Sequence, residues 1–300
     1  MILQVIGPAF LLVAVGYILG RRGRIPARPL AELSFWVLSP ALIFETLRTA
    51  QLPAKDAVLV ALFVLSHYGA MFLLSLLLGR LLFPADPDAR RTTSLLLTFG
   101  NCGNLGLPIL LFAYGPQAVD VGVIFLATNV VLLATLGVGI AGWEGKLNLR
   151  VLVRNILAAP WPYAVALAVG VRLAHAWPTA LARASALLSQ ATIPLFLLLL
   201  GVELAGANFR TLARSAGIVA LARLLWASAL AWLLAPFFAS TPLVQRTLVV
   251  AGSVPSAVNA YILAAQYRRK PELAATALLL STILSLGTLS LTLLLLERCG

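Results

Sequence analysis

The chain has 300 residues, of which 61% are hydrophobic and only 11% are charged, and its formal net charge is +12. A soluble domain averages roughly 45–50% apolar and 25% charged residues, so this composition excludes an ordinary soluble protein and indicates a membrane protein. The two cysteines, Cys102 and Cys299, are too few and too far apart to indicate a disulfide framework or a metal site.

Ten apolar runs follow one another along the chain, each bounded by charged residues or by proline and glycine. A helix needs roughly 20 apolar residues to span the hydrocarbon, and the runs lack the strict alternation of a membrane β-barrel. We therefore predict an all-α membrane protein with ten transmembrane helices, near residues 2–20, 33–49, 57–82, 92–112, 118–140, 158–174, 185–204, 215–238, 245–265 and 273–296.

Lysine and arginine are distributed unequally among the connections between these runs. The odd-numbered connections hold 15 of the 22 basic residues, the even-numbered connections and the C-terminus hold six, and Arg223 lies within a run. Because basic residues concentrate on the cytoplasmic side, we predict that both termini lie outside the inner (cytoplasmic) membrane. The positive charge then reflects topology and contact with anionic membrane lipid rather than a nucleic-acid-binding patch.

Residues of the first half recur in the second half at a nearly constant spacing. Pro8 and Pro40 recur 154 residues later, and Pro26 and Gly100 recur 152 residues later. The repeating unit then holds five helices, an odd number, so the second copy is predicted to be inverted relative to the first. The predicted organisation is one repeat over residues 1–140, a polar cytoplasmic connection over 141–157, and the inverted repeat over 158–300.

The fourth and ninth runs carry glycine, proline and polar residues at their centres. The fourth reads TFGNCGNLGLPI at residues 98–109, and the ninth reads VVAGSVPSAVNAYILAAQY at residues 249–267. Glycine lets a chain leave helical geometry and proline removes a backbone donor, and irregular backbone within a bilayer survives only where it is buried or lines a cavity. Paired interruptions in inverted repeats indicate a substrate site, although kinks that let helices pack closely give similar motifs.

Such interruptions offer binding groups without a permanent protein charge. The N-terminal ends of half-helices attract anions, and unwound carbonyl groups can hold a cation. No catalytic residue, metal site or organic cofactor is expected. The candidates for substrate binding are Asn101, Asn104, Pro108, Ser253, Pro255, Asn259 and Arg223.

Four ionisable residues within the predicted helices are further candidates, because charged side chains at membrane depth are often functional. Arg223 could bind a substrate carboxylate through two hydrogen bonds, or it could pair with a backbone carbonyl. His67 could titrate near neutral pH and couple transport to protons, or it could be a hydrogen-bonded packing residue. Glu45 and Glu203 could hold a coupling ion, or they could reach water or a neighbouring cation. Na+, H+ and no coupling ion all remain open.

The segments NCGNLGLPI and VPSAVNAYILAAQY, in a chain of ten apolar runs, resemble the auxin efflux carrier family, whose bacterial members include malonate-permease-like transporters. The resemblance covers essentially the whole chain and implies a fold like that of bile-acid/sodium symporters. In that fold the fourth and ninth helices unwind and cross, and a core of helices 3–5 and 8–10 moves past a scaffold of helices 1, 2, 6 and 7. The chain lacks the long central loop that plant auxin carriers often have, so auxin itself is not implied as the substrate. The residues that the resemblance places at the substrate site are Asn101, Asn104, Pro255 and Asn259.

The sequence therefore predicts a secondary transporter of small organic anions, such as malonate-like carboxylates, that works by elevator-like alternating access. The alternatives are a sodium-coupled bile-acid-type symporter and an exporter of another amphipathic solute. An intramembrane enzyme is less favoured, because the chain has no HExxH motif and its only histidines are His67 and His175. A channel is less favoured, because alternating access already explains the inverted repeat. The expected partners are the organic anion, membrane lipid and a second copy of the chain in a homodimer.

Overall fold

The computed structural model describes residues 2–23, 25–50, 52–142, 149–174, 177–206 and 213–298, and within these ranges every regular element is a helix. The predicted all-α class is therefore confirmed. Seven of the described helical stretches are long and apolar enough to cross a membrane. The chain is thus a multi-pass membrane protein, while Cys299 and His175 lie outside the described residues.

The helices follow one another with short connections. The first half contains α1 (Ile2–Arg21), α2 (Ala27–Leu33), η1 (Ser34–Leu38), α3 (Ser39–Thr49), α4 (Ala54–Leu82), α5 (Pro87–Thr98), η2 (Cys102–Gly106), α6 (Leu107–Tyr114), α7 (Pro116–Leu132), η3 (Leu133–Gly137) and α8 (Val138–Gly142). The second half contains α9 (Leu149–Ala158), α10 (Trp161–Ala174), α11 (Thr179–Ala205), α12 (Ala213–Phe238), α13 (Pro242–Gly252), α14 (Val258–Gln266) and α15 (Pro271–Arg298). Each η segment is a π-helical turn that runs directly into the α-helix after it.

Three of the ten predicted runs differ from the seven long stretches. The runs at 92–112 and 245–265 are each divided into two shorter helices, α5 with η2–α6 and α13 with α14. The run at 158–174 forms α10, which has only 14 residues. The predicted polar connection over 141–157 contains a helix, α9, because Arg150 and Arg154 lie four residues apart, on one helical face, among leucine, valine and isoleucine. Residues 143–148 of that connection lie outside the described ranges.

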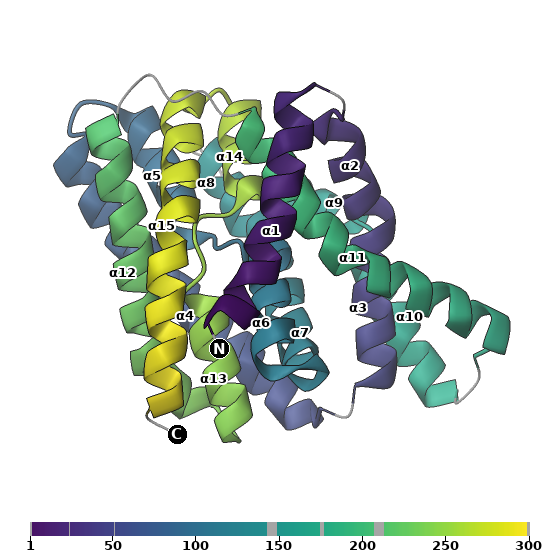
Figure 1. Cartoon of the computed structure of the whole chain (residues 1–300). Coiled ribbons are helices and arrows are strands. Elements are labelled where there is room, and N and C mark those ends of the chain that lie inside the picture. Colours follow the sequence, from purple (N-terminus) through teal and green to yellow (C-terminus); the bar gives the residue numbers. More distant parts are fainter. Residues whose placement is uncertain are drawn as a thin grey trace.

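Helices α1 and α11 pack backbone to backbone. A Cβ atom at Gly16 would collide with the carbonyl of Leu198, and one at Gly201 would collide with the carbonyl of Val13. Small residues are what allow membrane helices to approach so closely. Figure 1 shows α1 between two groups of helices, with α4, α5, α12 and α15 on one side and α2, α3 and α10 on the other.

The two ends of the molecule differ in their contacts. Helix α1 begins and α15 ends at the same end (Figure 1). At the opposite end, the α4–α5 connection meets the α14–α15 connection through two ion pairs, Lys270 Nζ with Asp86 and Arg269 Nη1 with Asp88, both at 2.8 Å. Arg269 Nε also donates to the carbonyl of Ala141 at 3.0 Å. These contacts join the ends of α5, α8 and α15.

Candidate functional site

The two interrupted segments meet in the structure. Helix α5 ends before Gly100 and α13 ends before Ser256, and these two residues lie opposite each other in an antiparallel β-bridge. The amide of Asn101 donates to the carbonyl of Pro255 at 2.8 Å, and the amide of Ala257 donates to the carbonyl of residue 99 at 2.9 Å. We call this arrangement of residues 97–104 and 252–259 the crossover, since the two broken segments pair where they pass each other.

Four helix ends converge on the crossover. The C-terminal ends of α5 and α13 carry partial negative charge, and the N-terminal ends of η2 and α14 carry partial positive charge. In η2, the carbonyl of Asn101 accepts from the amides of Leu105 and Gly106. The first amides of a helix have no backbone acceptor within that helix. The amides of Cys102 and Gly103 face the Cys102 sulfur, which is only a weak acceptor.

Arg223 of α12 binds both C-terminal ends at once. Its side chain is fully buried. Nε and Nη2 donate to the carbonyl of Val254 at 3.1 and 3.0 Å, and Nη1 donates to that of Leu97 at 2.7 Å. Longer bonds join Nη1 to Thr98 at 3.3 Å and Nη2 to Gly252 at 3.4 Å. Pairing with backbone carbonyls is thus the alternative that the structure shows, and a direct contact between Arg223 and substrate stays a prediction.

The polar residues of the first interruption are only partly satisfied. Asn101 is buried, and its Nδ2 atom has no hydrogen-bond partner among the described residues. Asn104 is partly exposed and belongs to η2, which packs against α11. Pro108 is buried in the first turn of α6. Unlike the two asparagines, it has no polar side-chain group and can contribute only an apolar contact.

The serines of the second interruption are bonded within the protein. Ser253 Oγ donates to the carbonyl of Val249 at 2.7 Å, and Ser256 Oγ donates to that of Leu96 at 3.0 Å. The carbonyl of Pro255 accepts from the first interruption, as described above. Asn259, in the first turn of α14, is exposed. Of the predicted residues on this side, Asn259 is therefore the one with a side chain open to a ligand.

Two buried polar residues behind the crossover were missed by the sequence analysis. Tyr68 of α4 donates its hydroxyl to Asn129 Oδ1 of α7 at 2.9 Å, and the amide of Gly100 lies 3.5 Å from the Tyr68 hydroxyl oxygen. Both side chains are buried. An asparagine in the middle of the 118–140 run was an available signal, because an amide at membrane depth needs a partner.

His67 lies next to Tyr68 but has a packing environment. Its ring is fully buried, donates from Nε2 to the carbonyl of Ala227 at 2.9 Å, and stacks on Phe63 at 5.5 Å between ring centroids. The Nδ1 atom has no partner among the described residues. The hydrogen-bonded packing alternative fits these contacts, and a role for His67 in proton coupling stays a prediction.

The two glutamates lie apart from the crossover. Glu45 of α3 forms an ion pair with Arg48 at 2.6 Å and accepts a hydrogen bond from Ser185 of α11 at 2.7 Å. Pairing with a neighbouring cation is the alternative that the structure shows for this residue. Glu203 lies in the last turn of α11, and its Oε2 atom is buried with no partner within the described ranges. No contact of either glutamate tests a coupling-ion role.

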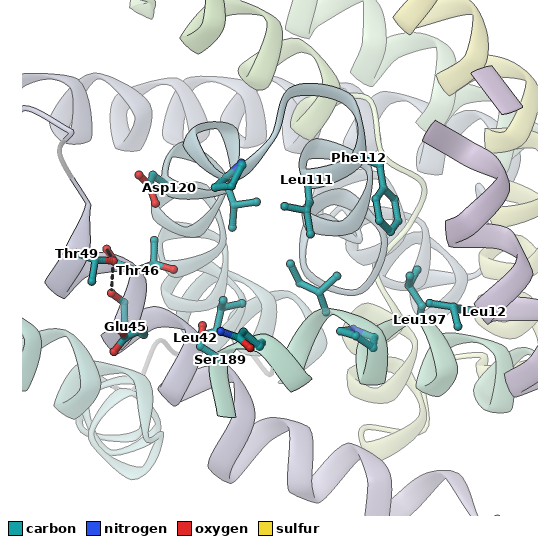
Figure 2. A pocket seen from close by; sticks show the side chains of 15 residues that line it. Leu12, Leu42, Glu45, Thr46, Thr49, Leu111, Phe112, Asp120, Ser189 and Leu197 are labelled. Carbon is teal, nitrogen blue, oxygen red and sulfur yellow. Dashed lines mark hydrogen bonds between the residues drawn. The ribbon is translucent and has the colours of Figure 1, made fainter. Parts of the chain in front are cut away.

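A cavity of about 370 Å³ lies between α3, α6, α7 and α11. Figure 2 shows that Glu45, Thr46 and Asp120 line one side of it, while Leu111 and Phe112 line the other. Of the predicted site residues, only Glu45 lines this cavity. Arg48 balances the charge of Glu45, and the cavity then keeps the carboxyl of Asp120 but no basic side chain in its lining. The crossover is therefore the better candidate for an anion site.

Comparison with known proteins gives one family. The profile of the family described as "Membrane transport protein" matches residues 1–150 and 146–293. A Rhizobium meliloti protein named "Putative malonate transporter" is 27% identical over an alignment of 301 positions, which covers 94% of this chain and 92% of the relative. Uncharacterized transporters of Methanothermobacter thermautotrophicus and Methanocaldococcus jannaschii are 30% and 24% identical, with 93% and 94% of both chains covered, respectively. The chain belongs to the membrane transport protein family, which is the auxin efflux carrier family that its two interrupted motifs resemble.

Proposed function

We propose that this protein is a secondary transporter of small organic anions, specifically carboxylates such as malonate-like acids, and that the anion binds at the crossover. The observation that carries the proposal is that Arg223 binds the two C-terminal helix ends at the crossover but not the N-terminal ends. Arg223 occupies both C-terminal ends, whereas the amides of residues 102–104 at one N-terminal end have no backbone acceptor within their helix.

The charge at the crossover supports an anionic substrate. A helix end carries about half an elementary charge, so two C-terminal ends contribute about −1 and the two N-terminal ends contribute about +1. The guanidinium of Arg223 adds a full positive charge, and the groups that it contacts are all backbone carbonyls. The sum is a net charge of about +1, which a bound carboxylate would balance.

The groups that remain available have the chemistry of a carboxylate site. Backbone amides at a helix N-terminus bind anions, and the buried Nδ2 atom of Asn101 is a further donor with no partner among the described residues. Asn104, in η2, is partly exposed, and Asn259, in the first turn of α14, is exposed. The name of the Rhizobium meliloti relative refers to malonate, a small dicarboxylate, and this favours the same class of substrate here.

The mechanism that we propose is alternating access by two inverted five-helix repeats in the cytoplasmic membrane, with both termini outside. Repeat-related residues lie at equivalent places: Pro26 and Pro178 precede the first residues of α2 and α11, and Gly100 and Gly252 lie at the two interruptions. Helices α4–α8 and α12–α15 would form the moving core, in which the crossover hydrogen bonds tie the α5–α6 segment to the α13–α14 segment. Helices α1–α3, α10 and α11 would form the scaffold.

A thermal-shift screen of the purified protein in detergent tests the substrate class. Dicarboxylates, monocarboxylates and indole acids are each compared with the matching amide, because a ligand that binds the native state raises the melting temperature by mass action. We expect one or more acids to stabilise the protein and the uncharged amides to have no effect. Stabilisation by neutral or cationic solutes alone would overturn the substrate class.

Two variants test the position of the site. Asn101→Ala and Asn259→Ala should reduce both the thermal shift and the transport of the stabilising acid into proteoliposomes, with little change in the melting temperature of the free protein. Ser290→Ala is the matched control, because the Ser290 hydroxyl donates to the carbonyl of Leu286 within its own helix, α15. Normal transport by both asparagine variants would place the anion elsewhere.

A further inference from the structure

The carbonyl groups at the crossover form a cage around one cation. The five N–H bonds of the Arg223 guanidinium are directed to four carbonyls, those of Leu97 and Thr98 at the end of α5 and of Gly252 and Val254 at the end of α13. An unwound helix end in a membrane usually satisfies such carbonyls with water, a neighbouring side chain or a bound cation. Here a side chain from a third helix, α12, supplies the cation.

The cage also fits the guanidinium by shape. A Cβ atom at Gly100 would collide with Nη2 of Arg223 and would lie 2.8 Å from a side-chain methyl of Val254. The absence of a side chain at this position is therefore what makes room for the planar group beside the β-bridge. Arginine is suited to such a place, because its fixed fork of donors binds several oxygens at once and its charge persists when it is buried.

We propose that Arg223 is a built-in cation that fills the carbonyl cage of the crossover, so that the conformational cycle requires no sodium ion there. This inference rests on the proposed transport function and narrows it, because it selects against the sodium-coupled alternative at this site. It also defines a latent cation site: removal of the side chain should leave a cage of four carbonyls that accepts a free guanidinium ion.

The expected consequences separate Arg223 from an ordinary buried side chain. Without the cation, the carbonyls of both half-helix ends lose their donors at once, so Arg223→Ala should lower the melting temperature by several degrees or more. Guanidinium should restore a large part of this loss, because it fits the cage. Choline should not, since it has no N–H donors. Cavity formation alone would not produce such selective rescue.

The test measures melting temperatures of wild-type protein, Arg223→Ala, Arg223→Lys and the exposed-residue control Arg80→Ala in detergent. Each is compared at equal ionic strength in sodium chloride, choline chloride and guanidinium chloride at low millimolar concentration. We expect wild-type protein and the control to melt equally in sodium and choline. Arg223→Ala should be stabilised saturably by guanidinium, and Arg223→Lys should melt between wild type and Arg223→Ala.

The proposal is overturned if guanidinium fails to stabilise a folded Arg223→Ala, or if sodium stabilises that variant as well as guanidinium does. If Arg223→Ala does not fold, the decision passes to Arg223→Lys. A lysine variant that melts like the wild type would also overturn the proposal, since lysine cannot reach four carbonyls with a planar fork. These measurements need no substrate, so they stand or fall independently of the anion screen.

Discussion

The two interruptions look alike in the sequence but differ in how their polar groups are used. In the second, Ser253 and Ser256 donate to carbonyls of the protein. In the first, Asn101 keeps an unpartnered buried amide nitrogen among the described residues, and Asn104 is partly exposed. The comparison teaches that the second segment mainly supports the crossover, whereas the first offers most of its free hydrogen-bond donors.

The largest loss of stability is expected at Gly100, where the packing of the two segments leaves no room for another carbon atom. Gly100→Ala would place a methyl group against the Arg223 guanidinium and Val254. Overpacking of this kind destabilises by about 1–3 kcal/mol, and displacement of Arg223 would add to the loss. The melting temperature should fall by several degrees. Gly69→Ala is the control, because a Cβ atom there would meet nothing within 4 Å; equal melting of the two variants would show that Arg223 can move freely.

A smaller effect should separate the residues that support the crossover from those that bind the anion. Ser256→Ala removes the donor to the carbonyl of Leu96, which should cost about 1–2 kcal/mol of stability and leave anion affinity nearly unchanged. Asn104→Ala should do the reverse, with reduced anion binding and an unchanged melting temperature. The measurement is a thermal-shift titration of both variants with the same acid. If the two variants lose stability and affinity in the same proportion, the proposed division between the segments is wrong.

The smallest effect concerns the ion pair that ties the core at the opposite end of the molecule. The hydrogen bond from Lys270, with the amide of Ala89, lowers the pKa of Asp86. A carboxyl with a lowered folded-state pKa stabilises the fold above its unfolded pKa of about 4, and this contribution disappears as the pH falls through the folded value. Both side chains are more than one-third exposed, so water and salt weaken the pair.

Melting curves of wild type and Lys270→Gln should therefore differ slightly at about pH 6. They should converge as the pH falls through the lowered folded-state pKa of Asp86, because the carboxyl is then protonated in both proteins. The same difference should shrink in high salt, since exposed ion pairs are screened. Arg80→Gln serves as a control for the loss of one exposed positive charge. A difference that persists at low pH would mean that Lys270 acts through contacts other than Asp86.

Composition and local motifs were sufficient to predict the all-α membrane class and both interruptions. Residues such as Gly100 and Pro255 act locally, because they change the conformation of their own segment. The run at 158–174 forms α10 over only 14 residues, Trp161–Ala174, so its bounds were predicted only approximately, since apolar composition does not show where a helix begins and ends. The ten-helix inverted repeat stays a prediction, although Pro26 and Pro178 both precede the start of a helix.

The contacts of the candidate site could not be derived in the same way. The sequence left Arg223 with two alternatives, because its acceptors lie 125 residues or more away in one segment and about 30 residues away in the other. The bond between Tyr68 and Asn129 depends likewise on how α4 and α7 pack. Such pairings are set by tertiary packing, and polarity within a run indicates only that some partner must exist.

The glycine contacts of α1 with α11 provide a fixed reference from which movements of other helices can be measured. Because Gly16 and Gly201 bring the two backbones together, neither helix can slide along the other without a steric clash. Spectroscopic labels on α1 and α11 would therefore keep a constant distance from each other. Labels on α6 or α14 would change their distance from this pair whenever the broken helices move. Distances measured from α1 and α11 would then distinguish a vertical displacement from a local rearrangement of the loops.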